Sequence, residues 1–352
     1  MGIPSIIITF IEKSRSVIAR SGAKNAGLII PLAMTNDNRT LKLAPGDDIP
    51  SSVSKYKDQI EQMLIGGSTQ PKKAVIAFAG VDYADITDAL EALADENASY
   101  IALSDSADTM ATKVVTWIKA QRNAGKNVKA VLPNTAADNE GIINYVTESV
   151  SVGDKTYTAE QFCARIAGLL AGTPITESAT YFVLTEATDC TRMTKEEMDT
   201  AIDDGKLILN YEDGKVRIVR AVNSFVTKSA EKGNQYKKIK LIDIMDTIRN
   251  DIKTTIKDEW IGKKANSYDN KCLLIAAIQN YFNDLIQQGV LSSASVEIDT
   301  SNNKKYLEEN GVDTTELNSE EIKQANTGDK VFLIAQIKMN DAIEDVSLEI
   351  NI

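Results

Sequence analysis

The sequence predicts an α/β protein: a parallel-sheet domain, then a C-terminal α+β domain, with extended strand arms at both ends. Three short apolar runs, at 73–80, 99–105 and 128–133, predict strands. Two stretches with helical apolar spacing separate these runs, and a helix between strands is typical of parallel pairing. Long helical patterns and hairpin signals follow after about residue 140, which predicts the second domain.

Each helix of the predicted parallel-sheet domain has one apolar face. The first, after Gly80, repeats apolar residues at helical spacing, and the second ends at Gly125, a residue that favours a helix C-terminus. The side chains expected to face the sheet are Ile86, Leu90 and Leu93 in the first helix, and Met110, Val114, Trp117 and Ile118 in the second.

Turn and capping residues define the elements that come next. Gly153 with Asp154, and Asp213 with Gly214, predict two hairpins, over 142–158 and 206–225. Two helices between or beside them begin with the capping-box pattern, in which a threonine is followed three residues later by Gln or Glu. The boxes are Thr158/Gln161 and Thr194/Glu197.

The longest helices lie after residue 237. One carries a stripe of isoleucines and a methionine, and the other ends at Gly289. Strands are expected over 290–298 and 330–339, with a polar loop or short helix over 300–329 between them. The stripe residues are Ile239, Ile242, Met245, Ile248, Ile252 and Ile256, and those of the second helix are Leu274, Ile278, Phe282 and Leu285.

Both ends of the chain are strand-like. In "DVSLEINI" apolar and polar residues alternate, and "SIIITFIEKS" at 5–14 is rich in β-branched residues. An open strand edge invites pairing with another chain, so both ends are candidate inter-subunit strand arms. The apolar residues expected to enter a neighbour's sheet are Ile6, Ile8, Phe10, Val346, Leu348, Ile350 and Ile352.

Charge is distributed unevenly along the chain. The net charge is −11 and the pI about 4.8, which argues against nucleic acid as a main partner. Residues 1–42 nevertheless hold six basic and two acidic residues, whereas residues 294–352 hold five basic and thirteen acidic ones. We expect the basic N-terminal segment of one subunit to dock near the acidic C-terminal region of another; the alternative is that both ends pack within their own subunit.

Several functional classes have no support in the residues. The chain has no histidine and three widely spaced cysteines, which excludes Ser–His–Asp and Cys–His catalysis and histidine-ligated metal. The Gly-Gly loop at 64–73 lacks the phosphate-loop spacing, and no run of about 18 apolar residues predicts a membrane span. No cofactor is therefore predicted. The alternative function is a cytosolic α/β nucleotide-dependent enzyme, because parallel sheets often bind nucleotides at their strand ends.

Three stretches resemble the contractile tail sheath family of phages and phage-derived bacteriocins. They are "TYTAEQFCARIAGLLAGTPITESATYFVL" (156–184), "GKLILNYEDGKVRIVRAVNSFVT" (205–227), and "KKIKLIDIMDTIRNDIKTTIKDEWIGK" running into "LLIAAIQNYFNDLIQQGVL" (237–291). With the terminal strand they cover most of residues 140–352, and the chain looks most like the compact sheaths of Gram-positive phages and R-type bacteriocins. The domains expected from this resemblance are an N-terminal strand arm (1–25), an α/β sheath domain (26–190), a C-terminal α+β sheath domain (191–339) and a C-terminal strand arm (340–352).

The resemblance implies a structural subunit without catalytic residues. Such subunits stack as hexameric rings into a helical sleeve around an inner tail tube, exchange terminal strands, and contract from a metastable extended state without nucleotide hydrolysis. The implied partners are further copies of the chain, the tube protein, and baseplate and tail-terminator proteins, with no direct nucleic acid and no membrane insertion. Assembly would occur in the bacterial cytoplasm, and the product would be part of a virion tail or bacteriocin particle.

The resemblance implies a role for one basic stretch and for two stretches that are expected to be flexible. Residues 228–264 hold ten basic and six acidic residues. The candidates for contact with an acidic tube surface are Lys253, Lys257, Lys263 and Lys264; a solvated helix face and nucleic-acid binding are the alternatives. We expect hinges at 21–27 and at 340–345, where small or polar residues can absorb backbone rotation.

Overall fold

The computed structural model describes residues 18, 24–33, 39–105 and 108–351. These residues form two compact units. The large unit contains 24–248 together with 341–351, and the small unit contains 249–340. Helix α6 (Ile239–Thr255) begins in the large unit and ends in the small one.

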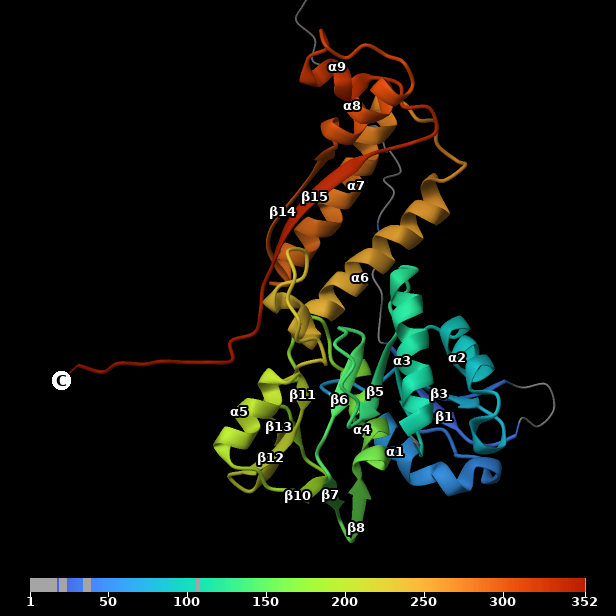
Figure 1. Cartoon of the computed structure of the whole chain (residues 1–352), viewed down its shortest axis with the longest axis vertical. Helices are drawn as coiled ribbons and strands as arrows, with labels where there is room; N and C mark the ends of the chain where they lie inside the picture. The colour runs from blue at the N-terminus through green and yellow to red at the C-terminus, as the bar shows by residue number, and fades with distance from the viewer. Residues whose placement is uncertain (1–17, 19–23, 34–38, 106–107, 352) are drawn as a thin grey trace, which may run out of the picture. The chain divides into compact units, whose positions relative to one another are not determined.

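A seven-stranded sheet forms the centre of the large unit (Figure 1). Its strand order is β11-β6-β5-β4-β1-β3-β2, and every neighbouring pair is parallel except β2 with β3. This confirms the predicted α/β class. The strands are β1 (Asn25–Ile30), β2 (Thr40–Leu43), β3 (Lys73–Phe78), β4 (Ala98–Leu103), β5 (Lys129–Pro133), β6 (Ile142–Tyr145) and β11 (Lys206–Leu207).

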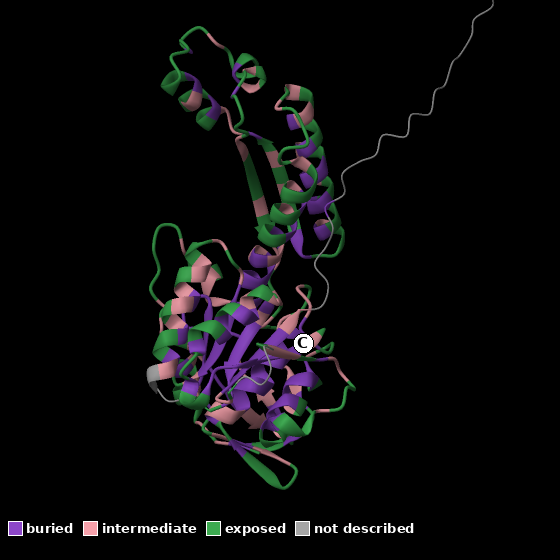
Figure 2. Cartoon of the chain, turned by 90° about the vertical axis from the view of Figure 1, so that its right-hand side faces the viewer, coloured by how far each residue is buried: buried purple, intermediate pink, exposed green. Residues whose placement is uncertain are grey.

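Helices cover both faces of this sheet, so its strands are apolar on both sides. Alternate side chains enter opposite cores: Leu28 lies in one cluster with α1 and α4, and Ile29 lies in the other with α2 and α3. Figure 2 shows the resulting buried layer along the sheet strands. The helices are α1 (Lys57–Ile65), α2 (Ile86–Asp95), α3 (Asp108–Asn123) and α4 (Ala159–Ala171).

Two small antiparallel sheets complete the large unit. Gly153 and Gly214 have positive φ at the predicted turns, and both capping boxes form at the predicted threonines. The two hairpins are shorter than predicted, because β6 and β11 leave them and pair in the main sheet. The remaining elements are β7 (Ser149–Val152), β8 (Lys155–Thr158), β9 (Val183–Leu184), β10 (Ala187–Cys190), α5 (Lys195–Asp203), β12 (Leu209–Glu212) and β13 (Lys215–Ile218).

One predicted hinge falls partly on a structured strand. Asn25–Ile30 forms β1, which lies between β3 and β4 in the main sheet. A side chain at Gly27 would crowd Leu93 and Ala98, so this glycine serves close packing of α2 on the sheet. The hinge predicted over 21–27 therefore does not extend into 25–27; residues 21–23 lie outside the described part.

The small unit is a helical pair with a two-stranded sheet. After α6 a π-helical turn (Ile256–Trp260) precedes α7 (Tyr268–Gln287). Strands β14 (Leu291–Ile298) and β15 (Leu333–Met339) pair antiparallel, and β14 packs on α7. The polar stretch between them contains α8 (Thr300–Glu309) and α9 (Ser319–Gln324).

Candidate functional site

The C-terminal segment after Asp345 exposes a row of apolar side chains. Val346, Leu348 and Ile350 are 82%, 78% and 74% exposed, and no strand pairs with this segment in the described structure. Figure 1 draws it as extended chain. Three regularly spaced apolar side chains in water are unusual for a segment that packs within its own subunit. Ile352, and the N-terminal candidates Ile6, Ile8 and Phe10, lie outside the described residues.

The residues just before this segment are held against the large unit. Glu344 has a side chain only 6% exposed, and Thr180, Arg220 and Lys238 surround it. Asp341 also pairs with Lys238, and Asp345 with Arg220. The stretch 340–345 was predicted as a hinge, but five of its six residues lie in an ion-paired segment, so this prediction needs correction.

The two-stranded sheet in the small unit has open edges. β14 and β15 each pair only with the other among the described strands, so each has one edge with unpaired backbone groups. One face of β15 carries half-buried apolar side chains, those of Leu333, Ile337 and Met339. The opposite face carries exposed side chains, among them Ile334 and Lys338. The sheet therefore has one apolar face and room for further strands. Figure 2 shows the contrast between its partly exposed strands and the buried main sheet.

The four predicted tube-facing lysines lie near one another along the chain and are all exposed. Lys253 is in the last turn of α6, Lys257 is in the π-helical turn, and Lys263 and Lys264 follow it. The Lys263 ammonium donates to the carbonyl oxygen of Asp258, which holds it at the end of this turn. The structure thus collects the four lysines at one end of α6.

The start of α6 is fixed by buried charges that the sequence analysis did not single out. Asp246 receives two hydrogen bonds from Arg122, at 3.0 and 3.2 Å, and its carboxylate lies 2.5 Å from the Lys129 ammonium. Asp243 accepts from the Tyr100 hydroxyl at 2.7 Å and pairs with Lys24 at 2.7 Å. Both carboxylates belong to α6, and their partners come from β4, β5, α3 and Lys24, which directly precedes β1.

Electrostatics explains why these carboxylates stay ionised although they are buried. Burial alone would raise the pKa of Asp246, but the charges of Lys129 and Arg122 outweigh it and lower that pKa to about 2. Burial would likewise raise the pKa of Asp243, and Lys24 and Lys129 lower it. An ionised pair of carboxylates therefore fastens α6 to the large unit. Aspartates spaced three apart on an isoleucine-rich helix were the available sequence signal.

The carboxyl ends of β1 and β4 are where a sheet of this order binds a ligand, since the strand order changes direction there. In this chain the Tyr83 side chain enters that region: its hydroxyl accepts from the Asp105 N–H at 3.0 Å and contacts the Ser104 hydroxyl at 3.3 Å. The Gln59 amide donates to the Ser104 carbonyl at 2.8 Å. The described residues thus use this position for internal hydrogen bonds.

The glycines of the Gly-Gly loop and of α4 allow close packing between α1, its following loop and α4. A Cβ on Gly168 of α4 would overlap the carbonyl oxygen of Met63 in α1, and one on Gly67 would lie 2.6 Å from the Leu169 carbonyl oxygen. Buried Arg165 donates to the Gly66 carbonyl at 2.7 Å and pairs with Glu186. Small residues therefore let α1 and its loop approach α4 closely.

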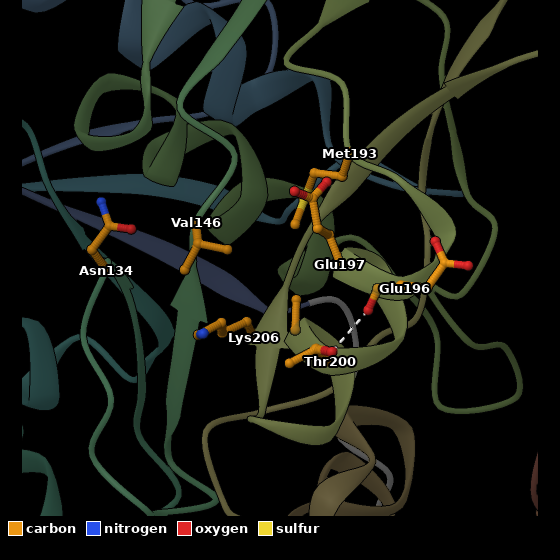
Figure 3. A pocket seen from close by; sticks show the side chains of 8 residues that line it. Asn134, Val146, Met193, Glu196, Glu197, Thr200 and Lys206 are labelled. Carbon is orange, nitrogen blue, oxygen red and sulfur yellow. Dashed lines mark hydrogen bonds between the residues drawn. The ribbon is translucent and has the colours of Figure 1, made fainter.

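A cavity of about 450 Å³ lies beside α5 (Figure 3). Two of its three charged residues already serve local structure, because Glu197 accepts from the Thr194 N–H in the capping box and Lys206 pairs with Asp204. No group of acidic or cysteine residues among those described could hold a metal ion. The lining residues are Asn134, Val146, Met193, Glu196, Glu197, Thr200, Ala201 and Lys206.

Two family models match the chain. The phage tail sheath protein central domain matches residues 79–224, and the phage tail sheath C-terminal domain matches residues 231–352. The chain belongs to the phage tail sheath family. A tail sheath protein of Clostridium phage phiCD119 is 37% identical over 357 residues, which cover 99% of each chain. The uncharacterized protein YqbK of Bacillus subtilis is 33% identical over 192 residues, 53% of this chain and 41% of its own length.

Solved sheath structures share the fold. The sheath tail protein of Desulfitobacterium hafniense has a TM-score of 0.69 and 18% identity, covering 84% of this chain and 94% of its own. The helical sheath of the anti-feeding prophage in its contracted state has a TM-score of 0.71 and 14% identity, covering 100% and 99%.

This sheath protein is a structural subunit of a phage tail sheath, and it is not an enzyme. The nucleotide-dependent alternative is thereby set aside. None of the helices in the described part of the chain is long and apolar enough to cross a membrane.

Proposed function

We propose that this sheath subunit polymerises as stacked hexameric rings around an inner tail tube and joins its neighbours by donating terminal strands. The observation that carries the proposal is the pairing of two complementary features in one chain. The segment after Asp345 exposes alternating apolar side chains, and the β14–β15 sheet has open edges over an apolar face. In this proposal the terminal segment of one subunit pairs with the two-stranded sheet of another.

The proposed pairing satisfies two physical requirements at once. Backbone groups of the donated strand would bond to an open edge, and its alternate side chains would extend the apolar face over α7. Burying Val346, Leu348 and Ile350 contributes on the order of 1.5–3 kcal/mol for each side chain. Ordering the strand and joining two subunits opposes this gain, so a single joint is weak and the assembled lattice is strong.

The N-terminal arm takes the same role in this proposal, through Ile6, Ile8 and Phe10, although it lies outside the described residues. Its basic neighbourhood fits the acidic region 294–352, which contains β15 and the C-terminal arm. Charge match of this kind guides which partner is chosen more than it adds affinity.

The basic end of α6 is the proposed contact with the tube. Lys253, Lys257, Lys263 and Lys264 are exposed along one short stretch, as a surface for an acidic partner requires. We expect reversal of all four to glutamate to leave the subunit folded and to reduce its assembly on tubes. Reversal of Lys304 and Lys305, exposed in α8 of the same unit, is the matched control and should leave tube assembly unchanged.

Contraction follows in the proposal from a sleeve assembled in a less stable, extended form. Folded bodies would move nearly rigidly and bury more surface in the final state, so that small gains per subunit add along the sleeve. Baseplate and tail-terminator proteins would hold and release the two ends. Purified extended sleeves should shorten on mild denaturant or heat without nucleotide. A requirement for ATP would contradict this part.

Electron microscopy after co-expression with the tube protein tests the whole proposal. The full chain should form sleeves on tubes, and deletion of residues 346–352 should leave folded subunits that do not polymerise. Normal sleeves from the truncated chain would refute strand donation by the C-terminal arm. Far-ultraviolet circular dichroism of both proteins checks that the deletion has not unfolded the subunit.

A further inference from the structure

The C-terminal arm begins at a buried carboxylate. Glu344 lies two residues before the exposed apolar row, yet its side chain is only 6% exposed. Its Oε1 accepts from the Thr180 hydroxyl at 2.8 Å, and its Oε2 lies 2.9 Å from the Lys238 ammonium and 3.3 Å from the Arg220 guanidinium. A carboxylate is buried in this way only when partners replace its water.

The three partners come from segments far apart in the sequence. Thr180 precedes β9, Arg220 follows β13, and Lys238 precedes α6. Backbone contacts hold the segments of Arg220 and Lys238 side by side. The Ile239 N–H donates to the Ala221 carbonyl at 3.2 Å, and Val222 forms a β-bridge with Lys238. Thr180, Arg220 and Lys238 form what we call the Glu344 cradle.

One member of the cradle, Thr180, is held in place by hydrogen bonds that do not involve the arm. The Thr180 hydroxyl accepts from the Ala221 N–H at 3.0 Å and from the Ser178 hydroxyl at 3.1 Å, so its own proton is left for Glu344. Asp341 and Asp345 flank Glu344 and pair with Lys238 and Arg220, at 2.5 and 2.7 Å. Each cradle cation therefore meets two carboxylates of the same short segment.

The carboxylates of residues 341–345 raise the pKa of both cradle cations. Burial would lower the pKa of Lys238, but hydrogen bonds and charges from Asp341 and Glu344 raise it. Burial would also lower the pKa of Arg220, and Asp345 and Glu344 raise it. Both groups thus stay charged at neutral pH while they hold the arm.

We propose that Glu344 is the anchor of the C-terminal arm, and that the Glu344 cradle sets where the arm leaves the subunit and how far it reaches. Residues 341–345 are fixed, and the pivot lies after Asp345 rather than across 340–345. The seven residues 346–352 then span about 23 Å when extended, against about 43 Å for the thirteen residues 340–352. A shorter tether limits the neighbours that the arm can reach.

Anchoring also prepares the arm for pairing. A free segment of the thirteen residues 340–352 must lose its conformational freedom when it binds, whereas an anchored one has lost much of that freedom already in the free subunit. Glu344 is therefore a positioning residue for assembly. The role in assembly depends on the proposed strand donation, but the anchor itself can be tested in the isolated subunit.

Spin labels on the two sides of the pivot test the anchor. In a Cys272→Ser background, Ile343→Cys and Ile350→Cys each give one exposed attachment point, since Cys163 and Cys190 are buried. The label at 343 should move several-fold more slowly than the label at 350. Glu344→Gln should reduce this difference, whereas Glu349→Gln, on the exposed arm, should preserve it.

Polymerisation of the same unlabelled variants tests the role in assembly. Glu344→Gln should raise the subunit concentration needed for sleeves about tenfold, the value of one charged hydrogen bond, and Glu349→Gln should leave it unchanged. A wild-type label at 343 as mobile as that at 350 would overturn the anchor. If Glu344→Gln makes the label at residue 343 mobile but leaves the subunit concentration needed for sleeves unchanged, the positioning role is wrong.

The two proposals fail in different experiments. If the chain without 346–352 forms normal sleeves, strand donation is wrong and with it the role of Glu344 in assembly. The mobility difference between labels 343 and 350 is measured on dispersed subunits, so it still decides whether the anchor exists.

Discussion

The two principal sheets of this sheath protein differ in the polarity of their strands and in what covers them. The seven-stranded sheet has helices on both faces, and its side chains enter two buried cores. The β14–β15 sheet has α7 on one face and two open edges among the described strands. Both faces of the first sheet are covered within one subunit, whereas the second is a small, partly exposed sheet of the kind that another chain can extend. Substitutions should therefore affect folding in the large unit and assembly at the small unit and the arm.

The largest effect on folding is expected from Asp246→Asn. This change leaves Arg122 and Lys129 buried with a weakened partner, which costs about 3–5 kcal/mol. Urea unfolding followed by Trp117 fluorescence measures it, because the two tryptophans of the chain, Trp117 and Trp260, fall one in each unit. A loss below about 1 kcal/mol would mean that the network does not hold α6.

Acid should reveal the same network in the wild-type protein. The pKa of Asp246 is about 2 in the folded state, below its ordinary value of 3.8, so its contribution is present above pH 4 and is lost as the pH falls toward 2. In the Asp246→Asn variant, the loss of stability between neutral pH and pH 2 should be smaller by roughly 2 kcal/mol, which is the share that Asp246 contributes in the wild-type protein. Equal pH profiles for both proteins would contradict the assignment.

Gly168→Ala should come next. The added Cβ meets the Met63 carbonyl oxygen, part of the backbone, and α1 must move away from α4, at about 3 kcal/mol. Gly233→Ala is the matched control, since Gly233 has open space around it and an ordinary φ of −97°. A stable Gly168→Ala protein would show that the helix pair is more adaptable than its contacts indicate.

The small unit should also gain stability as the pH rises, but in an alkaline range and through a lysine. Lys271 is 3% exposed, and its ammonium bonds to the Thr327 hydroxyl and the Ala325 carbonyl, both neutral. Burial lowers its pKa below 10.5, so stability should rise as the pH increases through that lowered value. Lys271→Met should remove the rise in stability that the wild-type protein shows below pH 10.5, measured through Trp260 in a Trp117→Phe background.

The smallest effect on folding, with the largest on assembly, is expected in the arm. Replacing Val346, Leu348 and Ile350 together by serine should change subunit stability by less than about 0.5 kcal/mol, because all three are exposed. Sleeves should be lost, since the donated apolar face is gone. Glu349→Gln with Asn351→Ser changes the opposite phase and should assemble normally. Equal behaviour of the two variants would contradict pairing in a fixed register.

Local patterns predicted the elements whose signals are short-range. The capping boxes at Thr158 and Thr194 and the turns at Gly153 and Gly214 form as predicted, because each depends on residues within a few positions. The pairing of strands is harder to predict from local patterns. β6 was expected in a hairpin and pairs with β5 and β11 instead, and β11 lies about sixty residues further along the chain.

The alternation in 345–352 was visible in the sequence, and so was the acidic character of 294–352. Glu344 was not distinguishable from Asp341, Asp345 or Glu349, since all four are acidic residues near a phase break. Only folding brings Thr180, Arg220 and Lys238 to the same carboxylate. The hinge prediction over 340–345 failed for this reason.

The sequence by itself determined the α/β class, the local caps and turns, the strand-like arm and the family to which the chain belongs. It did so because periodicity and short-range hydrogen bonding are properties of neighbouring residues. The tertiary structure alone decided which strands share the main sheet, how buried charges hold α6, and where the arm is anchored. Those outcomes depend on charges and edges that meet across long stretches of chain, and burial determines which of many similar residues matter.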